Sequence, residues 1–489
     1  MAMEPLDPRR RELARAGVQA LGKAGVRFGD VRVLCRERQW LQVKGDEVDV
    51  ATQTLDQGFA VRALVDGAWG FAGAPELSEA AIARAVDAAA SIARGSAAAD
   101  GRAPVSLAPV APQHGTYRTP RVRDPFDVPD AEKLDLLFRA AAALRTDPRI
   151  KVARATAVSL RLRSALCNTE GTDIEQETLV CGGGLGAIAT ADGEVQRRTY
   201  PKDMEGDIHA GGWEHLESLD LVANAPRVAD EAIALLSAPT CPAGTFRVVI
   251  DGAQMSLQIH ESCGHPTELD RALGDEISLA GASFLTPQRV GLRYGSPLVN
   301  LYADSTTPGG PGTFGWDDEG TPAGRHDLVK DGVFVGYLGS RETSARIGAP
   351  TAAAFRADSW SRLPIVRMVN VHLAPGDWRF EDLVADTDDG LLMSVNKSWS
   401  IDELRLNFQF GCEAAWEIKK GKRGRLFKNP VYTGITPQFW GACDAICGAD
   451  DWRVWGWMFC GKGDPMQIIH VGHGTSPARF NDVQVGARR

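Results

Sequence analysis

Residues 245–266 read TFRVVIDGAQMSLQIHESCGHP and contain, in this order, an apolar run, a helix start and a cluster of reactive side chains. The apolar run 245–250 is typical of a buried strand. Asp251 is a favourable helix N-cap, and Gln254 stands where the second half of a capping box would lie. We therefore expect a strand, a tight turn and a helix from about residue 252 to residue 263.

Two histidines flank a carboxylate at the end of this expected helix. Zinc accepts nitrogen, sulfur and oxygen ligands, and a catalytic zinc keeps one position open for water. A glutamate beside that position can take a proton from the water. His260 and His265 are therefore candidate zinc ligands, and Glu261 is a candidate general base.

The spacing of the two histidines differs from the H-E-x-x-H motif, in which they stand four residues apart. On a regular α-helix the five residues from His260 to His265 turn about 500°, which leaves the two rings about 140° apart. Gly264 can adopt backbone angles that other residues avoid, and Pro266 disfavours the helical conformation at His265. We expect the chain to leave the helix at Gly264 and to bring His265 back toward His260. A pair of structural histidines beside a Gly-Pro helix stop is the simpler alternative.

The composition indicates a large globular chain. It has 489 residues, 44% of them hydrophobic and 24% charged, which is more than one domain of ordinary composition. With a net charge of −9 and no basic run longer than Arg9–Arg11, it offers no nucleic-acid surface. We find no apolar stretch of the ~20 residues needed to span a membrane and no apolar signal-peptide region. Nine cysteines without regular spacing favour a reducing cytoplasm, so we expect a cytoplasmic location.

Apolar periodicity predicts an α+β fold in two domains. Helices are expected over 9–24, 77–92, 131–145 and 225–237, and strands over 31–35, 40–43, 58–65 and 158–163. This order predicts an N-terminal α/β domain, residues 1–237, in which helices cover a sheet, with a linker or sub-boundary over 96–129. Short strands and Gly/Pro turns predict that residues 238–489 form a β-rich domain carrying the metal-binding helix.

A catalytic zinc normally has three protein ligands, so the two histidines need a partner. Cys263 lies three residues after His260 and shares its helix face. Cys460 is followed by a glycine, which allows close approach, and Lys462 would help to hold a thiolate. The other candidates are Glu268, Asp270, His470 and His473. From the residues alone, the third ligand stays open.

Three further motifs admit a functional and a plain explanation. The acidic string Asp317–Glu319 could bind a cation or a peptide amine, or could be a solvated turn. The glycine-rich run 306–312 could be a mobile flap or a long loop. Cys443 and Cys447 could clip a metal or be inert buried thiols.

The second half of the chain resembles the TldD/PmbA metallopeptidases. Beside His260-Glu261-x-x-x-His265 with Glu268 and Asp270, the matching segments are Asp317–Pro322, Val329–Tyr337, Arg362–Asn370, Cys460–Lys462 and Asn481–Gly486. They follow one another in the family's order over most of residues 246–486. The N-terminal half agrees with the family only in general layout.

The resemblance implies a zinc metallopeptidase of the metal-bearing TldD type. Its implied Zn²⁺ ligands are His260, His265 and Cys460, with Glu261 as general base, and it argues against Cys263, because that position is usually apolar in the family. It also implies a heterodimer or higher oligomer with a PmbA (TldE)-like partner that lacks the motif, acting on short or unfolded peptides. The alternatives are a non-proteolytic binding or maturation subunit with a structural metal, and a zinc hydrolase of a non-peptide amide.

Overall fold

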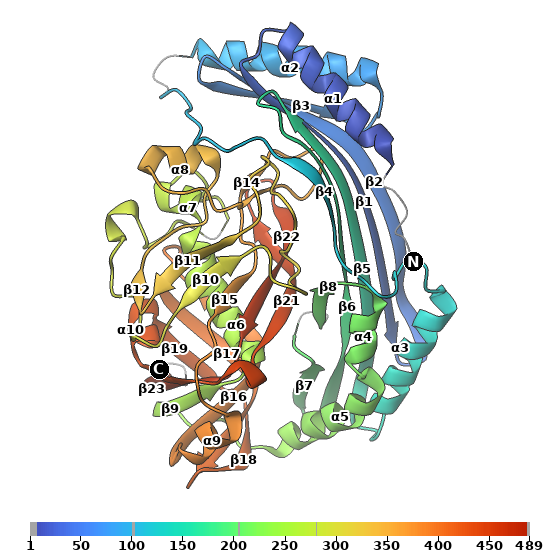
Figure 1. Cartoon of the computed structure of the whole chain (residues 1–489). Helices are drawn as coiled ribbons and strands as arrows, with labels where there is room; N and C mark the ends of the chain where they lie inside the picture. Colours follow the sequence, from blue (N-terminus) through green and yellow to red (C-terminus); the bar gives the residue numbers. More distant parts are fainter. Residues whose placement is uncertain (1–6, 100–102, 204–205, 280, 487–489) are drawn as a thin grey trace.

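The structure, a computed structural model, describes residues 7–99, 103–203, 206–279 and 281–486. Its N-terminal half is one long curved sheet with helices on the convex face, and its C-terminal half is a rounded, β-rich body on the concave side (Figure 1). The predicted α+β fold, with a helix-covered sheet followed by a β-rich part, is confirmed.

The N-terminal sheet has eight strands in the order β3-β2-β1-β5-β6-β4, with β7 and β8 also paired to β6. Its strands are β1 (Phe28–Lys44), β2 (Glu47–Val65), β3 (Ala68–Ala74), β4 (His114–Arg118), β5 (Ile150–Asn168), β6 (Asp173–Ala191), β7 (Glu194–Tyr200) and β8 (Asp207–Ala210). The runs 31–35 and 40–43, expected as separate strands, belong to one strand, because the polar residues between them pair with both β2 and β5.

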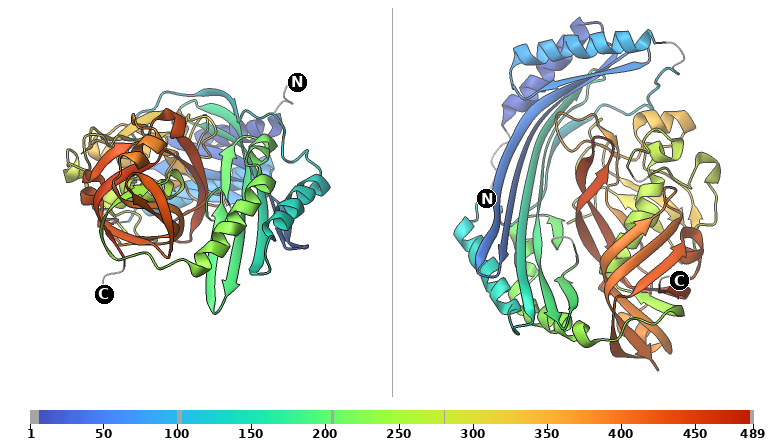
Figure 2. Two further views of the ribbon diagram at one scale, coloured as in Figure 1. Left: turned by 90° about the horizontal axis from the view of Figure 1, so that it is seen from below. Right: turned by 180° about the vertical axis from the view of Figure 1, so that it is seen from behind.

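Helices cover the convex face of this sheet at both ends (Figure 2). They are α1 (Pro8–Lys23), α2 (Glu79–Ala97), α3 (Asp130–Leu144), α4 (Trp213–Ser218) and α5 (Leu221–Ser237). At one end, α1 and α2 bury Leu13, Ile82 and Val86 against β1, β2 and β5. At the other end, α3 and α5 bury Leu137 and Val228 against β5 and β6.

The predicted linker contains a strand. Residues 114–118 form β4, which pairs in parallel with β6 and completes that edge of the sheet. Residues 100–102 of the linker lie outside the described residues. The predicted boundary at residues 237–238 coincides with the end of α5, and the division into two domains stays a prediction.

The C-terminal half is built on a sheet that closes on itself. Its path is β16-β9-β23-β19-β17-β18; β16 also pairs with β17, and β20 pairs with β23. These strands are β9 (Gly244–Ile250), β16 (Asp389–Ile401), β17 (Asn407–Lys419), β18 (Lys422–Lys428), β19 (Val431–Ile435), β20 (Cys443–Ile446) and β23 (Ala478–Val485). Helix α6 (Gly252–Ile259) follows β9 directly and buries Met255, Leu257 and Ile259 in the main apolar core.

Smaller elements complete this half. The strands are β10 (Leu301–Asp304), β11 (Arg325–Lys330), β12 (Val333–Phe334), β13 (Phe355–Arg356), β14 (Ile365–Val366), β15 (Val371–Leu373), β21 (Arg453–Lys462) and β22 (Gln467–Thr475). The helices are α7 (Leu269–Leu273), α8 (Arg341–Ile347), α9 (Phe380–Ala385) and α10 (Thr436–Gly441).

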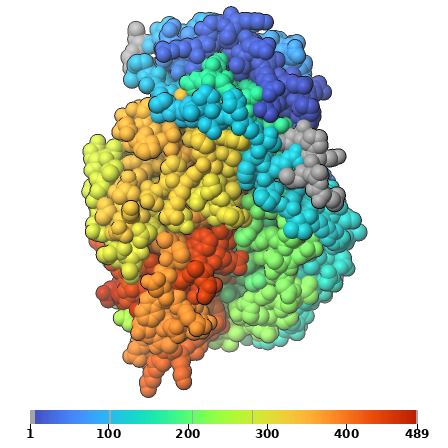
Figure 3. Space-filling model, viewed as in Figure 1, coloured from blue at the N-terminus to red at the C-terminus, as the bar shows by residue number. Residues whose placement is uncertain are grey.

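The two halves meet where the hairpin β21–β22 faces the concave side of the N-terminal sheet. Val158, Val180 and Ile208 of the sheet pack there against Met458 of β21. On the face shown in Figure 3, the surface is continuous across the two halves. Within the described residues, no helix is long and apolar enough to cross a membrane.

Candidate metal centre

Helix α6 starts as predicted and changes its winding at the histidines. The Asp251 carboxylate accepts a hydrogen bond from the Gln254 N–H at 2.8 Å, as expected for an N-cap. The Gln254 side chain does not complete the capping box, because it donates to the Tyr432 hydroxyl at 3.1 Å. The α-helix ends at Ile259, and His260–Gly264 form one π-helical turn.

The prediction that the chain leaves the helix at Gly264 is wrong. Gly264 and His265 both have right-handed helical backbone angles, with φ of −56° and −63°. The His265 N–H donates to the His260 carbonyl, the five-residue bond of a π-helix. One wide turn therefore stacks the two histidines on the same face, with ring centroids 4.8 Å apart. Glycine is needed at position 264 for space, because a Cβ there would overlap the sulfur of Met368.

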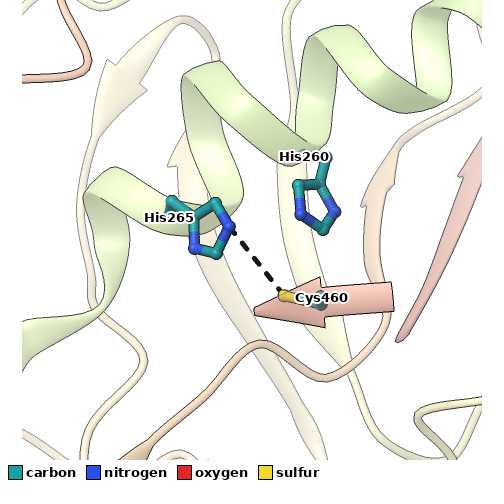
Figure 4. Close-up of side chains that lie close together, drawn as sticks. All are labelled: His260, His265 and Cys460. Atoms are coloured by element: carbon teal, nitrogen blue, oxygen red, sulfur yellow. Dashed lines mark hydrogen bonds between the residues drawn. The ribbon is translucent and has the colours of Figure 1, made fainter. Parts of the chain in front are cut away.

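The side chains of His260, His265 and Cys460 converge on one point (Figure 4). One donor atom from each lies within 4.8 Å of the other two, and Nε2 of His265 is 3.8 Å from Sγ of Cys460. The histidines come from the π-turn, and the cysteine comes from β21. All three are at least 96% buried. Two imidazole nitrogens and one sulfur form a donor set that zinc accepts.

A chain of hydrogen bonds fixes the tautomer of His260. Nδ1 of His473 lies 2.9 Å from the Val371 carbonyl, which can only accept, so this nitrogen donates. Burial holds the pKa of His473 well below its usual value, so Nε2 of the neutral ring is an acceptor. Nδ1 of His260, 2.8 Å from that atom, is therefore the donor. The lone pair of His260 is left on Nε2, which is the nitrogen available to a metal.

A carboxylate orients His265 in the same way. Nδ1 of His265 donates to Oε2 of Glu268 at 3.0 Å, which leaves Nε2 free to face Cys460. Glu268 is fully buried and also accepts from Arg271 at 2.9 Å, with the Lys462 ammonium 3.4 Å away. Burial alone would raise the pKa of Glu268, but Lys462 and His265 outweigh it and hold that pKa well below the usual value.

The pKa shifts of the three converging groups are in the direction that favours metal binding. Burial lowers the pKa of His260 to about 4 and also lowers that of His265, so both rings are neutral near pH 7. Burial raises the pKa of Cys460, but His265 and Arg367 outweigh it and bring that pKa below its usual value. Neutral imidazole and thiolate are the forms that coordinate a metal.

The candidate base Glu261 is held by an arginine from a distant part of the chain. Its Oε2 forms a salt bridge with Nη1 of Arg405, and both side chains are more than 90% buried. Arg405 sits between β16 and β17 with a positive φ of 62°. No local sequence signal marks this residue, which contacts the site only because the chain folds back over it.

The other proposed third ligands lie elsewhere. Cys263 is fully buried in the apolar core, where burial raises its pKa well above the usual value. Asp270 accepts from the Lys462 ammonium at 2.6 Å, so Lys462 binds this carboxylate and the Val366 carbonyl and makes no contact with the Cys460 thiol. His470 lines a separate cavity between the two halves.

The acidic turn Asp317–Glu319 is largely buried where the two halves meet and is not a solvated turn; we call it the acidic joint. Asp317 accepts from the backbone N–H groups of Glu319, Thr321 and Phe355 at 2.9–3.1 Å. Asp318 forms a salt bridge of 2.6 Å with Arg32 of β1. The turn therefore fastens the C-terminal half to the curved sheet.

The surroundings of the glycine-rich run and of the Cys443/Cys447 pair favour the structural explanation of each. In the run 306–312, Thr307 hydrogen bonds His372 at 2.9 Å and the Gly312 N–H donates to Asn370 at 2.8 Å, which favours a fixed loop. Cys443 and Cys447 lie in different apolar clusters and carry free thiols.

A second converging group, Asp207, His209 and His215, lies at the junction of the two halves. Two of its members have protein partners: Arg453 is 2.5 Å from Asp207, and Nε2 of His209 lies 2.9 Å from the Val454 carbonyl. Nε2 of His215 is buried without a hydrogen-bond partner among the described residues. The group therefore ties β8 to β21, the strand that carries Cys460.

Comparison with known proteins identifies the family. Residues 243–487 match the PmbA/TldA metallopeptidase C-terminal domain, residues 29–93 match domain 1, and residues 123–238 match the central domain. The chain belongs to the PmbA/TldD metallopeptidase family. The segments matching domain 1 and the central domain share the single curved sheet of the N-terminal half.

PmbA/TldD relatives match nearly the whole chain. A metalloprotease of Methanothermobacter thermautotrophicus is 29% identical, covering 94% of this chain and 96% of the relative. One from Methanocaldococcus jannaschii is 27% identical over 92% and 95%. A zinc metalloprotease TldD homologue of Saccharolobus solfataricus is 20% identical over 94% and 97%.

Solved structures share the fold at low sequence identity. TldE from Thermococcus kodakarensis has a TM-score of 0.73 at 14% identity, covering 98% of this chain and all of that one. A Bacteroides thetaiotaomicron protein described as a modulator of DNA gyrase has a TM-score of 0.77 at 13% identity, covering 99% and 100%. At these identities the likeness concerns the fold alone.

Proposed function

We propose that this chain is the metal-bearing, TldD-type zinc metallopeptidase of its family and hydrolyses peptide bonds in short or unfolded peptides. The observation that carries the proposal is the convergence of His260, His265 and Cys460, with the Glu261 carboxylate one residue from the first ligand. The name of the Saccharolobus relative, a zinc metalloprotease, agrees with zinc as the ion.

The residues fit a zinc ion. Both imidazoles carry their protons on Nδ1, held by His473 and Glu268, and turn Nε2 toward the thiol. A hydrogen bond from the nitrogen that does not bind the metal orients a histidine ligand and increases its basicity. When bound here, zinc would supply Lewis-acid polarisation of a peptide carbonyl and a water nucleophile active near neutral pH.

The protein residues handle the protons. As water attacks the scissile carbonyl carbon, the Glu261 carboxylate takes one proton from it. Glu261 then passes that proton to the leaving amine as the C–N bond breaks, so the carboxylate is regenerated. Arg405 acts as a positioning residue, because its guanidinium fixes the orientation of the Glu261 carboxylate.

The decisive variant is Glu261→Gln. It removes the base while keeping a similar shape, so we expect unchanged zinc content and a loss of roughly 10²–10⁴-fold in hydrolysis of an unfolded peptide. Undiminished hydrolysis would remove Glu261 from the mechanism. A zinc-loaded wild type that binds peptides without cleaving them would favour the non-proteolytic binding or maturation subunit. Cleavage confined to small amides would favour a zinc hydrolase of a non-peptide amide.

We also propose a PmbA/TldE-like partner. The proposal is supported by TldE, a solved chain that shares this architecture over 98% of the present chain. Affinity purification from the native host, followed by mass determination of the intact complex, tests it. We expect a second, related chain in the complex, and a chain that purifies alone or only with its own copies would contradict the pairing.

A further inference from the structure

A cavity of about 350 Å³ lies between the two halves of the molecule. Strands β5, β6 and β7 of the curved sheet form one wall, and strand β16 of the C-terminal half forms the other. No residue of the metal centre lines it, so the cavity is a separate feature of the described structure.

Most of the charged side chains among the described residues that line this cavity are cationic. Arg154, Arg197, Lys202 and Lys397 line it, against one acid, Asp203. Asp203 already accepts a hydrogen bond of 2.6 Å from Asn396, and Arg197 pairs with Glu413 at 3.1 Å. Among the described residues, Arg154 and Lys397 form no ion pair, although Nζ of Lys397 donates hydrogen bonds to Asn429 at 2.8 Å and to Gln196 at 3.4 Å. The net charge of the described side chains that line the cavity is therefore positive, which favours an anionic ligand.

Three buried polar atoms of the cavity wall have no hydrogen-bond partner in the described structure. They are the donors Nε of Arg154 and Nε of Arg197, the latter in an ion pair with Glu413, and the acceptor Oδ1 of Asn396. Buried polar atoms are normally paired, because an unpaired one loses its hydration without compensation. A donor with positive charge and an acceptor on opposite walls of one cavity fit a ligand that carries both a carboxylate and an N–H.

One indole ring connects this cavity to the metal centre. The Lys202 ammonium lies 3.8 Å from the centroid of the Trp457 ring, and that ring lies 5.6 Å from the imidazole of His260. Trp457 is fixed by a hydrogen bond of 3.0 Å from its Nε1 to Ser256 of α6. The Trp457 ring therefore contacts one residue of the cavity wall and one residue of the candidate centre.

We propose that this cavity binds a carboxylate of the peptide substrate, with Arg154 and Lys397 as its cationic partners. Asn396 accepts a backbone N–H of the same peptide. The assignment rests on the proposed peptidase function and adds a substrate class to it, namely peptides that present a carboxylate near the bond to be cleaved. The carboxylate is either the free C-terminus or an acidic side chain.

Binding of matched peptides to the zinc-loaded, full-length Glu261→Gln chain tests the assignment without hydrolysis. The probes are one fluorescent, unstructured peptide without acidic residues in three forms: C-terminal acid, C-terminal amide, and amide with one Gln replaced by Glu. We expect at least one carboxylate form to bind about tenfold tighter than the neutral amide, because charge-assisted hydrogen bonds are the strong ones. Whichever form binds tighter identifies the source of the carboxylate.

Variants in the same background assign the preference to the cavity. Arg154→Gln and Lys397→Gln should each reduce the preference while binding the neutral amide as before, which also shows that they are folded. Arg139→Gln, an exposed arginine on α3, is the matched control and should keep the preference. Equal binding of all three peptides, or a preference that survives in both cavity variants, would overturn the proposal.

The result is separable from the proposed function. A chain that prefers carboxylate peptides through Arg154 but cleaves none of them in its wild-type form would contradict the peptidase and leave the cavity assignment standing. A wild type that cleaves all three peptides with the same KM would contradict the cavity assignment and leave the peptidase standing.

Discussion

Nδ1 of His260 lies 2.8 Å from Nε2 of His473, although 213 residues separate them. His473 is not one of the three converging residues, and its ring meets the His260 ring edge-on, with centroids 5.0 Å apart. The pair shows that the candidate centre depends on β22 as well as on the π-turn and β21.

Replacing His473 should weaken metal binding without removing a ligand. In His473→Ala the Nδ1–H of His260 loses its acceptor, so the ring is free to rotate and to change tautomer. We expect zinc affinity to fall about 10–100-fold, measured by competition with a chromophoric chelator. His473→Gln places an amide oxygen near the lost nitrogen and should recover part of the affinity. Wild-type affinity in His473→Ala would contradict the positioning role.

Gly264→Ala should destabilise the chain even though its backbone angles suit alanine. The added Cβ would overlap the Met368 sulfur, and overpacking of this kind costs about 1–3 kcal/mol. Denaturant unfolding at equilibrium measures the cost. In the double variant Gly264→Ala/Met368→Ala the shorter side chain opens the space, so the cost should be smaller than the sum of the two single-variant costs. A single variant as stable as wild type would mean that the close approach to Met368 is unimportant.

The acidic joint makes stability depend on pH. Burial raises the pKa of Asp317 to about 7 and that of Glu319 to about 8, reinforced by the charge of Asp318 on Asp317 and by the charge of Asp317 on Glu319. Since their unfolded values are about 4, the folded chain binds these protons more tightly, and the stabilisation present at low pH is lost as the pH rises through about 8.

We therefore expect the denaturation midpoint to fall between about pH 5 and pH 9, and Glu319→Gln to reduce the fall, because the amide resembles the protonated acid. Glu47→Gln, an exposed glutamate on β2, is the control and should leave the slope unchanged. A slope that is the same in Glu319→Gln and wild type would show that Glu319 is ionised throughout this range.

Local patterns predicted what depends on neighbours in sequence. The periodic apolar residues of α1, α2, α3 and α5 and the apolar run of β9 formed the expected elements. The union of two runs into β1, the strand β4 in the linker and the closure of β16 on β17 depend on pairing with distant strands. The local sequence of a strand does not show which distant strand it pairs with.

The candidate site divides in the same way. Side-chain chemistry identified His260, Glu261 and His265, but the predicted route by which the histidines meet was wrong, because they meet through a π-helical turn and not through a helix exit at Gly264. The positions of Arg405 and His473, 144 and 213 residues from their partners, follow from the tertiary fold alone. Cys460 was identified through resemblance, since the residues left Cys263 as an equal candidate.

Zinc content of matched cysteine variants tests the central claim most directly. Wild type, Cys460→Ser and Cys263→Ser are purified from zinc-supplemented cells, and metal and protein are quantified by mass spectrometry and amino-acid analysis. We expect about one zinc ion per chain in wild type and in Cys263→Ser, and little zinc in Cys460→Ser. Full zinc in Cys460→Ser, or its loss in Cys263→Ser, would contradict a centre formed by His260, His265 and Cys460.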